Sequence, residues 1–336
     1  MPSERKYLVT GGTGFLGSAL VKAMVDRGDD VRVLDNNFRG SASKLGEAYL
    51  DKIEMVEADI RDAGAVDEAT KGVDMVCHLA FINGTKHFYE IPEVVLDVGI
   101  RGTQNTLEAA IKHGVKEYVF ASSSEVYQTP PSVPTDEQVP TCIPDTLNPR
   151  YSYGGAKLIG EILAFNYGRK HFDRTLVFRP HNAYGPDMGF EHVIPQLALR
   201  MRRAAAEAGG GKIPFQIQGD GSETRAFNNV HDFIAGLLLV IDKGEDRNLY
   251  HIGTNEEVSI RDLVLKIADQ LGVEIEIQST PRPAGGTPRR CPDISKLQGL
   301  GYEPKISLDD GLREIVSWYA DWADRHPEKA LELSAI

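Results

Sequence analysis

The sequence predicts an α/β protein with a doubly wound parallel sheet and a smaller C-terminal α/β lobe. Three observations lead to this prediction. Short apolar runs that are typical of buried strands alternate with helical patterns from residue 6 to residue 179, as in sheets whose parallel strands are joined by helices. A glycine-rich turn directly follows the first run. Because 336 residues exceed the length at which one hydrophobic core usually stops growing, a second lobe is expected.

The elements can be assigned in chain order from their periodicity. Strands of the sheet are expected at 6–10, 30–34, 53–57, 74–79, 117–121 and 174–179, with helices at 18–26, 94–112 and 151–170. Beyond them the alternation is looser, with helices at 192–206, 230–241, 259–271 and 308–325 and strands at 215–219 and 249–253. We therefore expect a first domain over 1–181, to which segments near 225–255 return, and a smaller lobe over 182–330.

Composition excludes several classes of protein. The net charge of −12 argues against a surface that binds nucleic acid. No apolar run reaches eighteen residues, so no membrane span is predicted. Cys77, Cys142 and Cys291 lie far apart without metal-type spacing. We predict a reduced, cytoplasmic protein with neither a disulfide framework nor a metal site.

A dinucleotide-binding turn is indicated where the first strand ends. Gly11, Gly14 and Gly17 give the spacing G-x-x-G-x-x-G ahead of a helix, and glycines there let a phosphate approach backbone N–H groups at the helix start. Asp35 ends the second strand, 35 − 17 = 18 positions after Gly17, where a carboxylate accepts from the adenosine ribose hydroxyls. It would also repel a 2′-phosphate, which favours NAD over NADP, although Arg39 offers a charge that would soften this preference.

Other polar residues follow neighbouring strands of the predicted sheet. Asp59 and Ile60 come after the third strand, where a carboxylate and an amide can meet an adenine edge. Ala80 follows the fourth strand, and the serines 122–124 follow the fifth. Since ligands bind beyond the carboxyl ends of parallel strands, we group these residues with the glycine turn.

A tyrosine and a lysine four residues apart provide the candidate base. Tyr153 and Lys157 lie on one face of the expected helix 151–170. A free tyrosine titrates near pH ~10, and a neighbouring ammonium lowers that pKa by favouring the phenolate. A serine hydroxyl at the end of the fifth strand would then share a substrate hydroxyl with the phenolate. The alternative is a surface Tyr–Lys pair on an amphipathic helix.

Taken together, these motifs resemble the extended short-chain dehydrogenases/reductases that act as nucleotide-sugar epimerases, dehydratases and decarboxylases. The matching stretches are 10–17, Asp35, 59–60, 78–80, 122–127, 153–157, 179–186, Arg225, 290–296 and 300–304. The resemblance implies a Rossmann-like fold, an NAD-binding domain over 1–181 and a substrate-binding lobe over 182–330. It also implies a homodimer formed through the helices near 99–112 and 153–170.

The resemblance implies a role for each matching residue. Tyr153 would be the base that acts on a sugar hydroxyl, Lys157 would hold the nicotinamide ribose, and Ser123 would be the catalytic serine. Ser124 and Glu125 are the further catalytic candidates. The positions expected to bind NAD are Gly11, Gly14, Phe15, Leu16, Gly17, Asp35, Asn36, Asp59, Ile60, Leu79, Ala80, Tyr153, Lys157, Pro180 and His181.

Four residues are expected to bind the nucleotide sugar, namely Asn182, Val193, Arg225 and Arg290. Asn182 and Arg225 match positions that grip the diphosphate, and Arg290 matches an arginine near the diphosphate or the sugar. The alternatives are a turn residue for Asn182 and solvated surface charges for the two arginines. His181 either touches the nicotinamide or satisfies a buried hydrogen bond.

Two residues depart from the family's pattern. Gly99 stands where an asparagine is frequent, which removes a possible contact in the relay of the tyrosine. Gln128 replaces the usual glycine after Val126-Tyr127 and would alter a lid over the substrate.

The residues after Ser123 bear on the reaction. A 4,6-dehydratase usually carries Asp-Glu there, whereas this chain has Ser124-Glu125 and lacks the aspartate. The UDP-glucuronate decarboxylases carry Ser-Glu, and Arg290 also fits their pattern. We predict an NAD-dependent epimerase that acts at C4 of a nucleotide hexose or uronate through a transient 4-keto sugar. A decarboxylase or dehydratase is the alternative, and a non-catalytic NAD sensor is a third.

Overall fold

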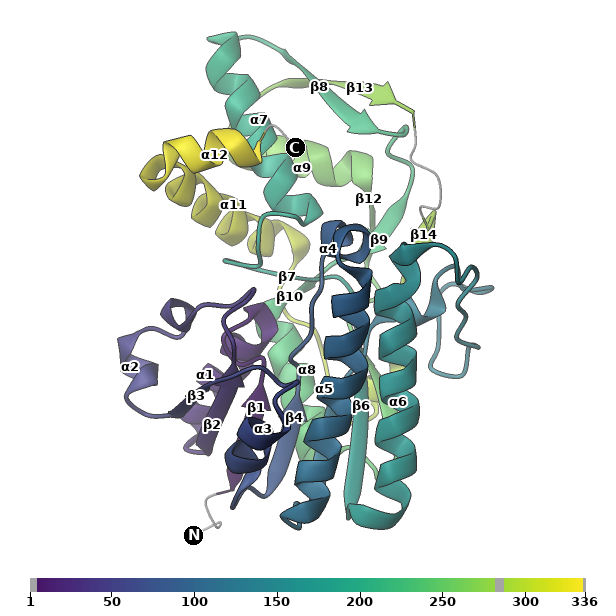
Figure 1. The fold of residues 1–336 in the computed structure, drawn as a ribbon. Helices are drawn as coiled ribbons and strands as arrows, with labels where there is room; N and C mark the ends of the chain where they lie inside the picture. Colours follow the sequence, from purple (N-terminus) through teal and green to yellow (C-terminus); the bar gives the residue numbers. More distant parts are fainter. Residues whose placement is uncertain (1–4, 282–286, 335–336) are drawn as a thin grey trace.

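The computed structural model describes residues 5–281 and 287–334, and a seven-stranded sheet lies at its centre (Figure 1). The strands are β1 (Lys6–Thr10), β2 (Asp30–Asp35), β3 (Glu54–Glu57), β4 (Met75–His78), β5 (Glu117–Ala121), β6 (Arg174–Pro180) and β11 (Asn248–Ile252). Their order is β11-β6-β5-β4-β1-β2-β3, and every neighbouring pair is parallel. The order runs outward in both directions from β1 and β4, so their carboxyl ends flank the crevice in which such sheets bind ligands.

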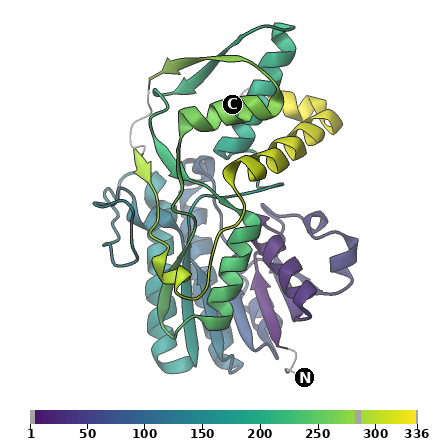
Figure 2. The same ribbon diagram turned by 180° about the vertical axis from the view of Figure 1, so that it is seen from behind.

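Helices cover both faces of this sheet. On one face lie α3 (Ala63–Thr70), α5 (Pro92–Lys112) and α6 (Ser152–His171), and on the other lie α1 (Phe15–Arg27) and α8 (Val230–Lys243), as Figures 1 and 2 show. Successive strand residues point to opposite faces. Tyr7 and Val9 therefore belong to the apolar core beneath α1 and α8, whereas Leu8 belongs to the core beneath the other helices.

The smaller lobe has an apolar core of its own. Three helices, α7 (Val193–Ala208), α9 (Ile260–Leu271) and α11 (Leu308–Arg325), surround buried residues such as Phe215, Ile267 and Ile315. β8 (Ile213–Gln218) pairs in parallel with β13 (Ile275–Thr280) beside them. The remaining elements are α2 (Glu47–Leu50), α4 (Thr85–Glu90), β7 (Ala183–Tyr184), β9 (Thr224–Ala226), β10 (Asn228–Asn229), β12 (Glu257–Ser259), β14 (Arg289–Arg290), α10 (Ser295–Gln298) and α12 (Pro327–Leu333).

The structure confirms the predicted fold class. β1, β5 and α11 have the predicted bounds, and the other predicted strands and helices differ at their ends by three residues or fewer. The sequence reading missed short elements, among them α3, α4, β13 and α12. α4 buries only Phe88, so it has no apolar stripe from which its helical period could be recognised.

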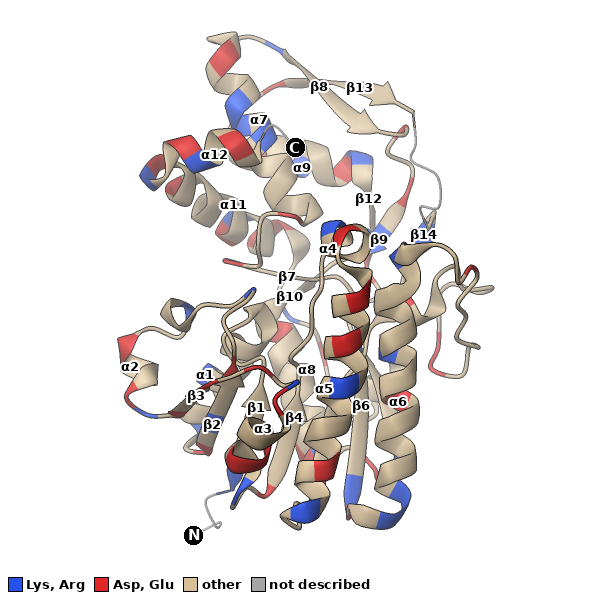
Figure 3. Ribbon diagram, in the orientation of Figure 1, with Lys and Arg blue, Asp and Glu red and all other residues tan. Residues whose placement is uncertain are grey.

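The charged residues are distributed over both lobes, as expected for a chain with a net charge of −12 (Figure 3). Acidic residues recur along α5, and basic residues are scattered over both lobes (Figure 3). Among the described residues, no helix combines the length and the apolar content that are needed to cross a bilayer.

Candidate active site

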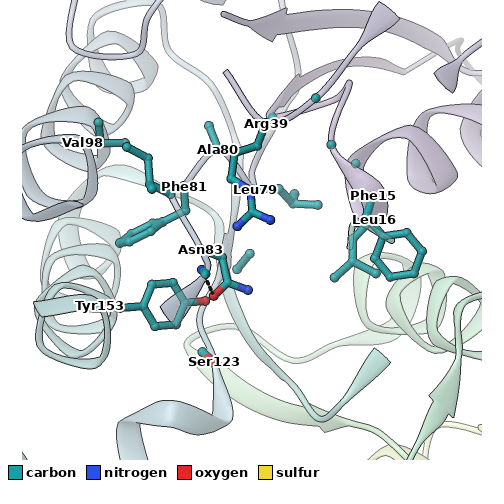
Figure 4. A pocket seen from close by; sticks show the side chains of 18 of the residues that line it. Phe15, Leu16, Arg39, Leu79, Ala80, Phe81, Asn83, Val98, Ser123 and Tyr153 are labelled. Atoms are coloured by element: carbon teal, nitrogen blue, oxygen red, sulfur yellow. Dashed lines mark hydrogen bonds between the residues drawn. The ribbon is translucent and has the colours of Figure 1, made fainter. Parts of the chain in front are cut away.

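A cavity of about 500 Å³ lies at the carboxyl ends of β1, β4 and β5 and reaches the smaller lobe. The glycine turn, the ends of β2 and β4, the serines after β5 and the start of α6 line it from the sheet side. Residues 188–189 and 191–192 and Arg290 line it from the lobe side. Figure 4 shows Phe15, Arg39, Phe81 and Tyr153 arriving at this space from different elements.

The glycine turn has no room for side chains where its backbone folds closely. Gly11 has a φ of +75°, and a Cβ added there would lie 2.6 Å from the Ala80 nitrogen. A Cβ on Gly17 would lie 2.0 Å from the Gly11 carbonyl oxygen. The turn leads directly into α1, whose first backbone N–H groups are free to bind an anion. This cradle fits the diphosphate of a dinucleotide.

The Asp35 carboxylate faces this turn. It accepts hydrogen bonds from the backbone N–H of Thr13 at 3.0 Å and of Asn37 at 2.9 Å. The placement fits a ribose acceptor beside the turn. Asp59 is engaged by its neighbour Arg61, which donates from Nε at 3.0 Å and from Nη2 at 2.8 Å. The hydrogen bonds from Arg61 lower the pKa of Asp59, so its carboxylate is ionised at neutral pH.

His78, at the end of β4, forms hydrogen bonds beneath the glycine turn. Its buried ring joins the Thr10 hydroxyl at 2.7 Å and the Thr103 hydroxyl at 3.1 Å. The Thr10 hydroxyl also accepts from the Ala80 N–H at 3.2 Å. His78 therefore has a structural role, because it connects β1, β4 and α5 under the glycine turn.

The structure brings Ser123, Tyr153 and Lys157 to the same wall of the pocket. Ser123 caps the turn 124–127, and its Oγ accepts from the Glu125 N–H at 3.2 Å. The buried Lys157 Nζ donates to the Ala121 carbonyl oxygen at 2.6 Å and lies 3.8 Å from the centre of the Phe81 ring. Tyr153 packs edge-on against Phe81 and stacks on Phe88 of α4.

The pKa of Tyr153 differs from the sequence-based expectation. Burial raises it to about 12, and the Glu125 charge adds to this effect, while Ser123 and Arg39 act against it. Burial also lowers the pKa of Lys157 to about 7. The prediction that Lys157 lowers the pKa of Tyr153 is therefore wrong for this structure, because the ammonium is directed to a carbonyl oxygen and an aromatic ring rather than to the phenol.

Glu125 and Arg290 form an ion pair within the pocket. Arg290 Nη1 lies 2.6 Å from Glu125 Oε1, and Arg150 Nη2 lies 3.9 Å from Oε2. Burial alone would raise the pKa of Glu125, but Arg290, with help from Arg150 and Arg225, outweighs burial and lowers it. Arg290 also donates to the Thr287 hydroxyl at 3.3 Å. Arg290 is thus a pocket residue, and its alternative as a solvated surface charge is excluded.

Not every predicted site residue lines the cavity. His181, Val193 and Arg225 are absent from its wall among the described residues, whereas Asn182 is part of it. Asn182 has a φ of 42° and donates to the Ala226 carbonyl oxygen at 3.1 Å, so it also shapes a turn. Arg225 donates to the Thr224 carbonyl oxygen at 2.7 Å and acts on Glu125 through its charge.

His181 is buried beside a second histidine. Its ring packs edge-on against His251 with the centroids 4.6 Å apart. Neither ring nitrogen has a hydrogen-bond partner in the described part of the chain, so the alternative of a satisfied buried hydrogen bond is not supported. Burial holds the pKa of His181 well below its usual value, and the ring is neutral.

Several pocket residues were not predicted. Phe81 and Phe88 enclose Tyr153, and Asn83 and His192 reach the same space. Gly99 accounts for Phe81, because a Cβ there would lie 2.4 Å from Phe81 Cζ. The aromatic ring fills the space that the missing asparagine would need. The departure at Gly99 was visible in the sequence, but its aromatic counterpart could only be found from the packing of α5 on the β4–α4 segment.

Comparisons with known proteins place the chain among NAD-dependent enzymes that act on nucleotide sugars. A sequence model described as the NAD dependent epimerase/dehydratase family matches residues 7–253. The chain is 32% identical over 330 residues to the UDP-N-acetyl-alpha-D-glucosaminuronate decarboxylase of Bacillus cytotoxicus, covering 95% of this chain and 98% of that protein.

Two solved structures have similar folds. The UDP-glucose 4-epimerase of Thermotoga maritima, solved with UDP-glucose, matches with a TM-score of 0.82 and 27% identity over 94% of this chain and 99% of that chain. The dTDP-glucose 4,6-dehydratase of Streptomyces venezuelae, solved with NAD and TYD bound, matches with a TM-score of 0.82 and 29% identity over 96% of this chain and 99% of that chain. The three relatives carry out three different reactions on nucleotide sugars.

Proposed function

The chain belongs to the NAD-dependent epimerase/dehydratase family of nucleotide-sugar enzymes, and from this premise we propose that it is an epimerase. Its substrate would be a nucleotide hexose or uronate, inverted at C4 through a transient 4-keto sugar. NAD is the cofactor, and the glycine turn and Asp35 would hold it. NAD, when bound, accepts the C4 hydride and later returns it.

Tyr153 and Ser123 supply the proton transfer in this proposal. Tyr153 takes the proton of the C4 hydroxyl while that oxygen becomes a carbonyl oxygen, and it returns the proton when the carbonyl is reduced. Ser123 hydrogen-bonds the same oxygen. Lys157 would hold the nicotinamide ribose. The aromatic enclosure by Phe81 and Phe88 keeps water away from the phenol.

The state of Glu125 is the observation that carries the choice of epimerisation over dehydration. Loss of water from a 4-keto sugar needs one group that removes the C5 proton and an acid that protonates the leaving hydroxyl. Ser124 stands where, by resemblance, the 4,6-dehydratases carry their aspartic acid, and Glu125 is ionised and paired with Arg290 at 2.6 Å. This arrangement supplies no carboxylic acid, so the 4-keto sugar is reduced again rather than dehydrated.

Decarboxylation of a uronate is the second candidate, and the same ion pair favours it. Arg290 lies in the pocket wall and offers a guanidinium that can bind a carboxylate. Once C4 is a ketone, the bond between C5 and the carboxyl carbon can break as carbon dioxide leaves. The electron pair then forms an enolate, which takes a proton at C5. The relative from Bacillus cytotoxicus, a decarboxylase by name, supports keeping this candidate.

We further propose that two copies of the chain associate through α5 and α6. These helices lie side by side (Figure 1) and expose Leu96, Ile159 and Ile162. Exposed apolar residues on adjacent helices are typical of a subunit interface.

The products formed from a panel of nucleotide sugars and uronates test the proposal. The protein is incubated with each compound and NAD, and the products are separated and weighed by mass spectrometry. An isomer of unchanged mass is expected. Loss of carbon dioxide would replace epimerisation by the second candidate, and loss of water would overturn the argument from Glu125. A Tyr153→Phe variant with full activity would contradict the mechanism for either reaction, and no turnover of any compound would favour the NAD sensor.

A further inference from the structure

Gln128 has a backbone conformation that residues with a side chain rarely adopt. Its φ is 54° and its ψ is −98°, a region that glycine enters freely and in which a Cβ costs free energy. This is the position at which the chain departs from the glycine that is usual after Val126-Tyr127. Because such strain persists only where the surroundings fix it, the glutamine is expected to make contacts that a glycine could not.

The side-chain amide of Gln128 turns back onto the segment that contains Ser123. Its Nε2 donates to the Glu125 carbonyl oxygen, which also accepts the backbone N–H of Gln128 at 3.3 Å. Only the nitrogen of an amide can donate to a carbonyl oxygen, so the chemistry fixes the orientation of this side chain. Both hydrogen bonds close the turn 124–127, which Ser123 caps.

The same amide lies against the helix that carries Tyr153. A Cβ added to Gly154 would lie 2.8 Å from Gln128 Nε2 and 3.1 Å from the Glu125 carbonyl oxygen. Gly154 is buried and directly follows Tyr153, so the amide has room only because position 154 has no side chain. The Gln128 side chain is therefore packed between the turn 124–127 and the start of α6.

The backbone carbonyl of Gln128 completes a closed ring of hydrogen bonds. It accepts from the Thr287 hydroxyl at 3.1 Å, and that hydroxyl accepts from Arg290 Nη2 at 3.3 Å. Arg290 Nη1 donates to Glu125 Oε1 at 2.6 Å, and the Glu125 carbonyl oxygen leads back to the Gln128 amide. The ring joins the turn after β5 to the segment that contains Arg290.

The chain beyond Gln128 is fixed beside that segment. Thr135 donates its N–H to the Cys291 carbonyl oxygen at 2.9 Å, and Asp293 donates its N–H to the Thr135 carbonyl oxygen at 2.7 Å. Gln128 is not among the described residues that line the cavity. Any effect that it has on a ligand therefore passes through the residues that it holds in place.

We propose that Gln128 is a positioning residue that fixes Ser123 and the Glu125–Arg290 pair relative to Tyr153. The role rests on the proposed function and applies equally to epimerisation and decarboxylation, because both begin with oxidation at C4. A glycine at position 128 would relieve the backbone strain but would lose the amide that connects the turn to α6. Strain that is retained where reacting groups must be placed accurately is common at catalytic sites.

Two substitutions separate the strain from the hydrogen bond. Gln128→Met keeps the length of the side chain and the strain but has no N–H donor, and Gln128→Gly removes both. We expect the thermal midpoint of Gln128→Met to lie about 1–3 °C below that of the wild type through the lost hydrogen bond. The midpoint of Gln128→Gly should be higher than that of Gln128→Met, because the strain is relieved. Gln138→Ala, at an exposed glutamine of the same loop, is the control and should change nothing.

Steady-state kinetics show whether the role is one of positioning. With UDP-glucose or UDP-glucuronate, whichever the wild type converts, both variants should lower kcat about 10-fold or more and change KM less than about twofold. Thr287→Val breaks the same ring at another hydrogen bond. In Gln128→Met/Thr287→Val the loss in kcat should therefore be smaller than the product of the single losses. A kcat that is unchanged, or that follows the thermal midpoint so that Gln128→Gly is more active than Gln128→Met, overturns the inference.

Amide hydrogen exchange tests the same claim without a substrate. In the NAD-loaded protein, the segment 122–128 should exchange about 10-fold faster in Gln128→Met than in the wild type, as for the loss of one hydrogen bond. Unchanged exchange overturns the inference even if kcat falls. If the wild type converts no nucleotide sugar, the proposed function fails, and the exchange rates still decide whether Gln128 holds the turn.

Discussion

At the scale of single residues, the environment of Tyr153 explains both its enclosure and its high pKa. Phe81 and Phe88 surround the phenol, and Phe81 also lies over the ammonium of Lys157. Gly99 permits this arrangement, since a Cβ there would lie 2.4 Å from Phe81 and 2.8 Å from Ala156. One small residue thus sets the aromatic wall of the candidate site.

This contact predicts coupling between Gly99 and Phe81. Gly99→Ala should destabilise the protein by about 1–3 kcal/mol through overpacking, even though alanine is the better helix former. In Gly99→Ala/Phe81→Ala the clash with Phe81 is removed and only the one with Ala156 is left, so the combined loss should be smaller than the sum of the single losses by about 1 kcal/mol. Urea unfolding of the four proteins measures this. Losses that add to within about 0.5 kcal/mol would contradict the contact.

The buried Lys157 predicts a pH-dependent stability. Its pKa is lowered to about 7 in the folded protein, whereas an unfolded lysine titrates near ~10.4. Between these values the unfolded chain binds more protons, so the contribution of Lys157 to stability rises with pH, by up to about 1.4 kcal/mol per pH unit. The unfolding free energy of the wild type minus that of Lys157→Met should therefore increase from pH 7 to pH 9. A difference independent of pH would show that the lysine is not desolvated.

At the scale of elements, α6 is fastened to the sheet by a buried ion pair. Glu161, one turn after Lys157, receives hydrogen bonds from Arg179 of β6, from Nε at 2.8 Å and from Nη2 at 2.6 Å. Ser122 also donates to Glu161, and Arg179 donates to Tyr127. The Glu161–Arg179 pair therefore connects α6, which carries Tyr153, and the segment 122–127, which contains Ser123, to β6.

Removal of one partner should be costly. Glu161→Gln leaves the buried Arg179 charge without a counter-charge, so we expect a loss of about 3–5 kcal/mol. Glu161→Gln/Arg179→Met removes both charges and should recover most of that loss. Thermal unfolding at neutral pH compares the two. The pair has no such role if the single variant loses less than about 1 kcal/mol.

The elements also show what the sequence could predict. α5 is predicted to within two residues because its apolar residues repeat on one face. α6 is predicted to within one residue although most of the residues it buries are small or polar. β13 was missed because none of its residues is fully buried. The site residues that follow strand ends were located by topology alone. Their pKa values were not predictable, because desolvation depends on residues distant in sequence, such as Phe81 and Glu161.

At the scale of the whole molecule, the candidate site lies between two separate cores. The sheet supplies the glycine turn and Tyr153, and the lobe supplies Arg290. Lys44 bridges the two by donating to the Asp187 carbonyl oxygen at 2.7 Å. The domain boundary at 181/182 is still a proposal, and it would place Tyr153 and Arg290 in different domains.

The proposed homodimer also belongs to this scale. Ile162 of α6 is 54% exposed, and we expect Ile162→Lys to dissociate the dimer by placing a charge in its apolar interface. Sedimentation at micromolar concentration measures the change. Leu331→Lys on α12, where the leucine is 57% exposed, is the matched control and should remain dimeric. A wild-type protein that is monomeric at all concentrations would exclude the interface.

The most direct test of the central claim follows the hydrogen at C4. A nucleotide sugar labelled with deuterium at C4 is converted by the NAD-loaded protein, and the product is examined by NMR and mass spectrometry. Transient oxidation predicts an epimer that keeps its deuterium at C4, and about a 10²- to 10⁴-fold slower reaction in Tyr153→Phe. Loss of the label to water would contradict the account, because the C4 hydrogen would then have left as a proton rather than as a hydride.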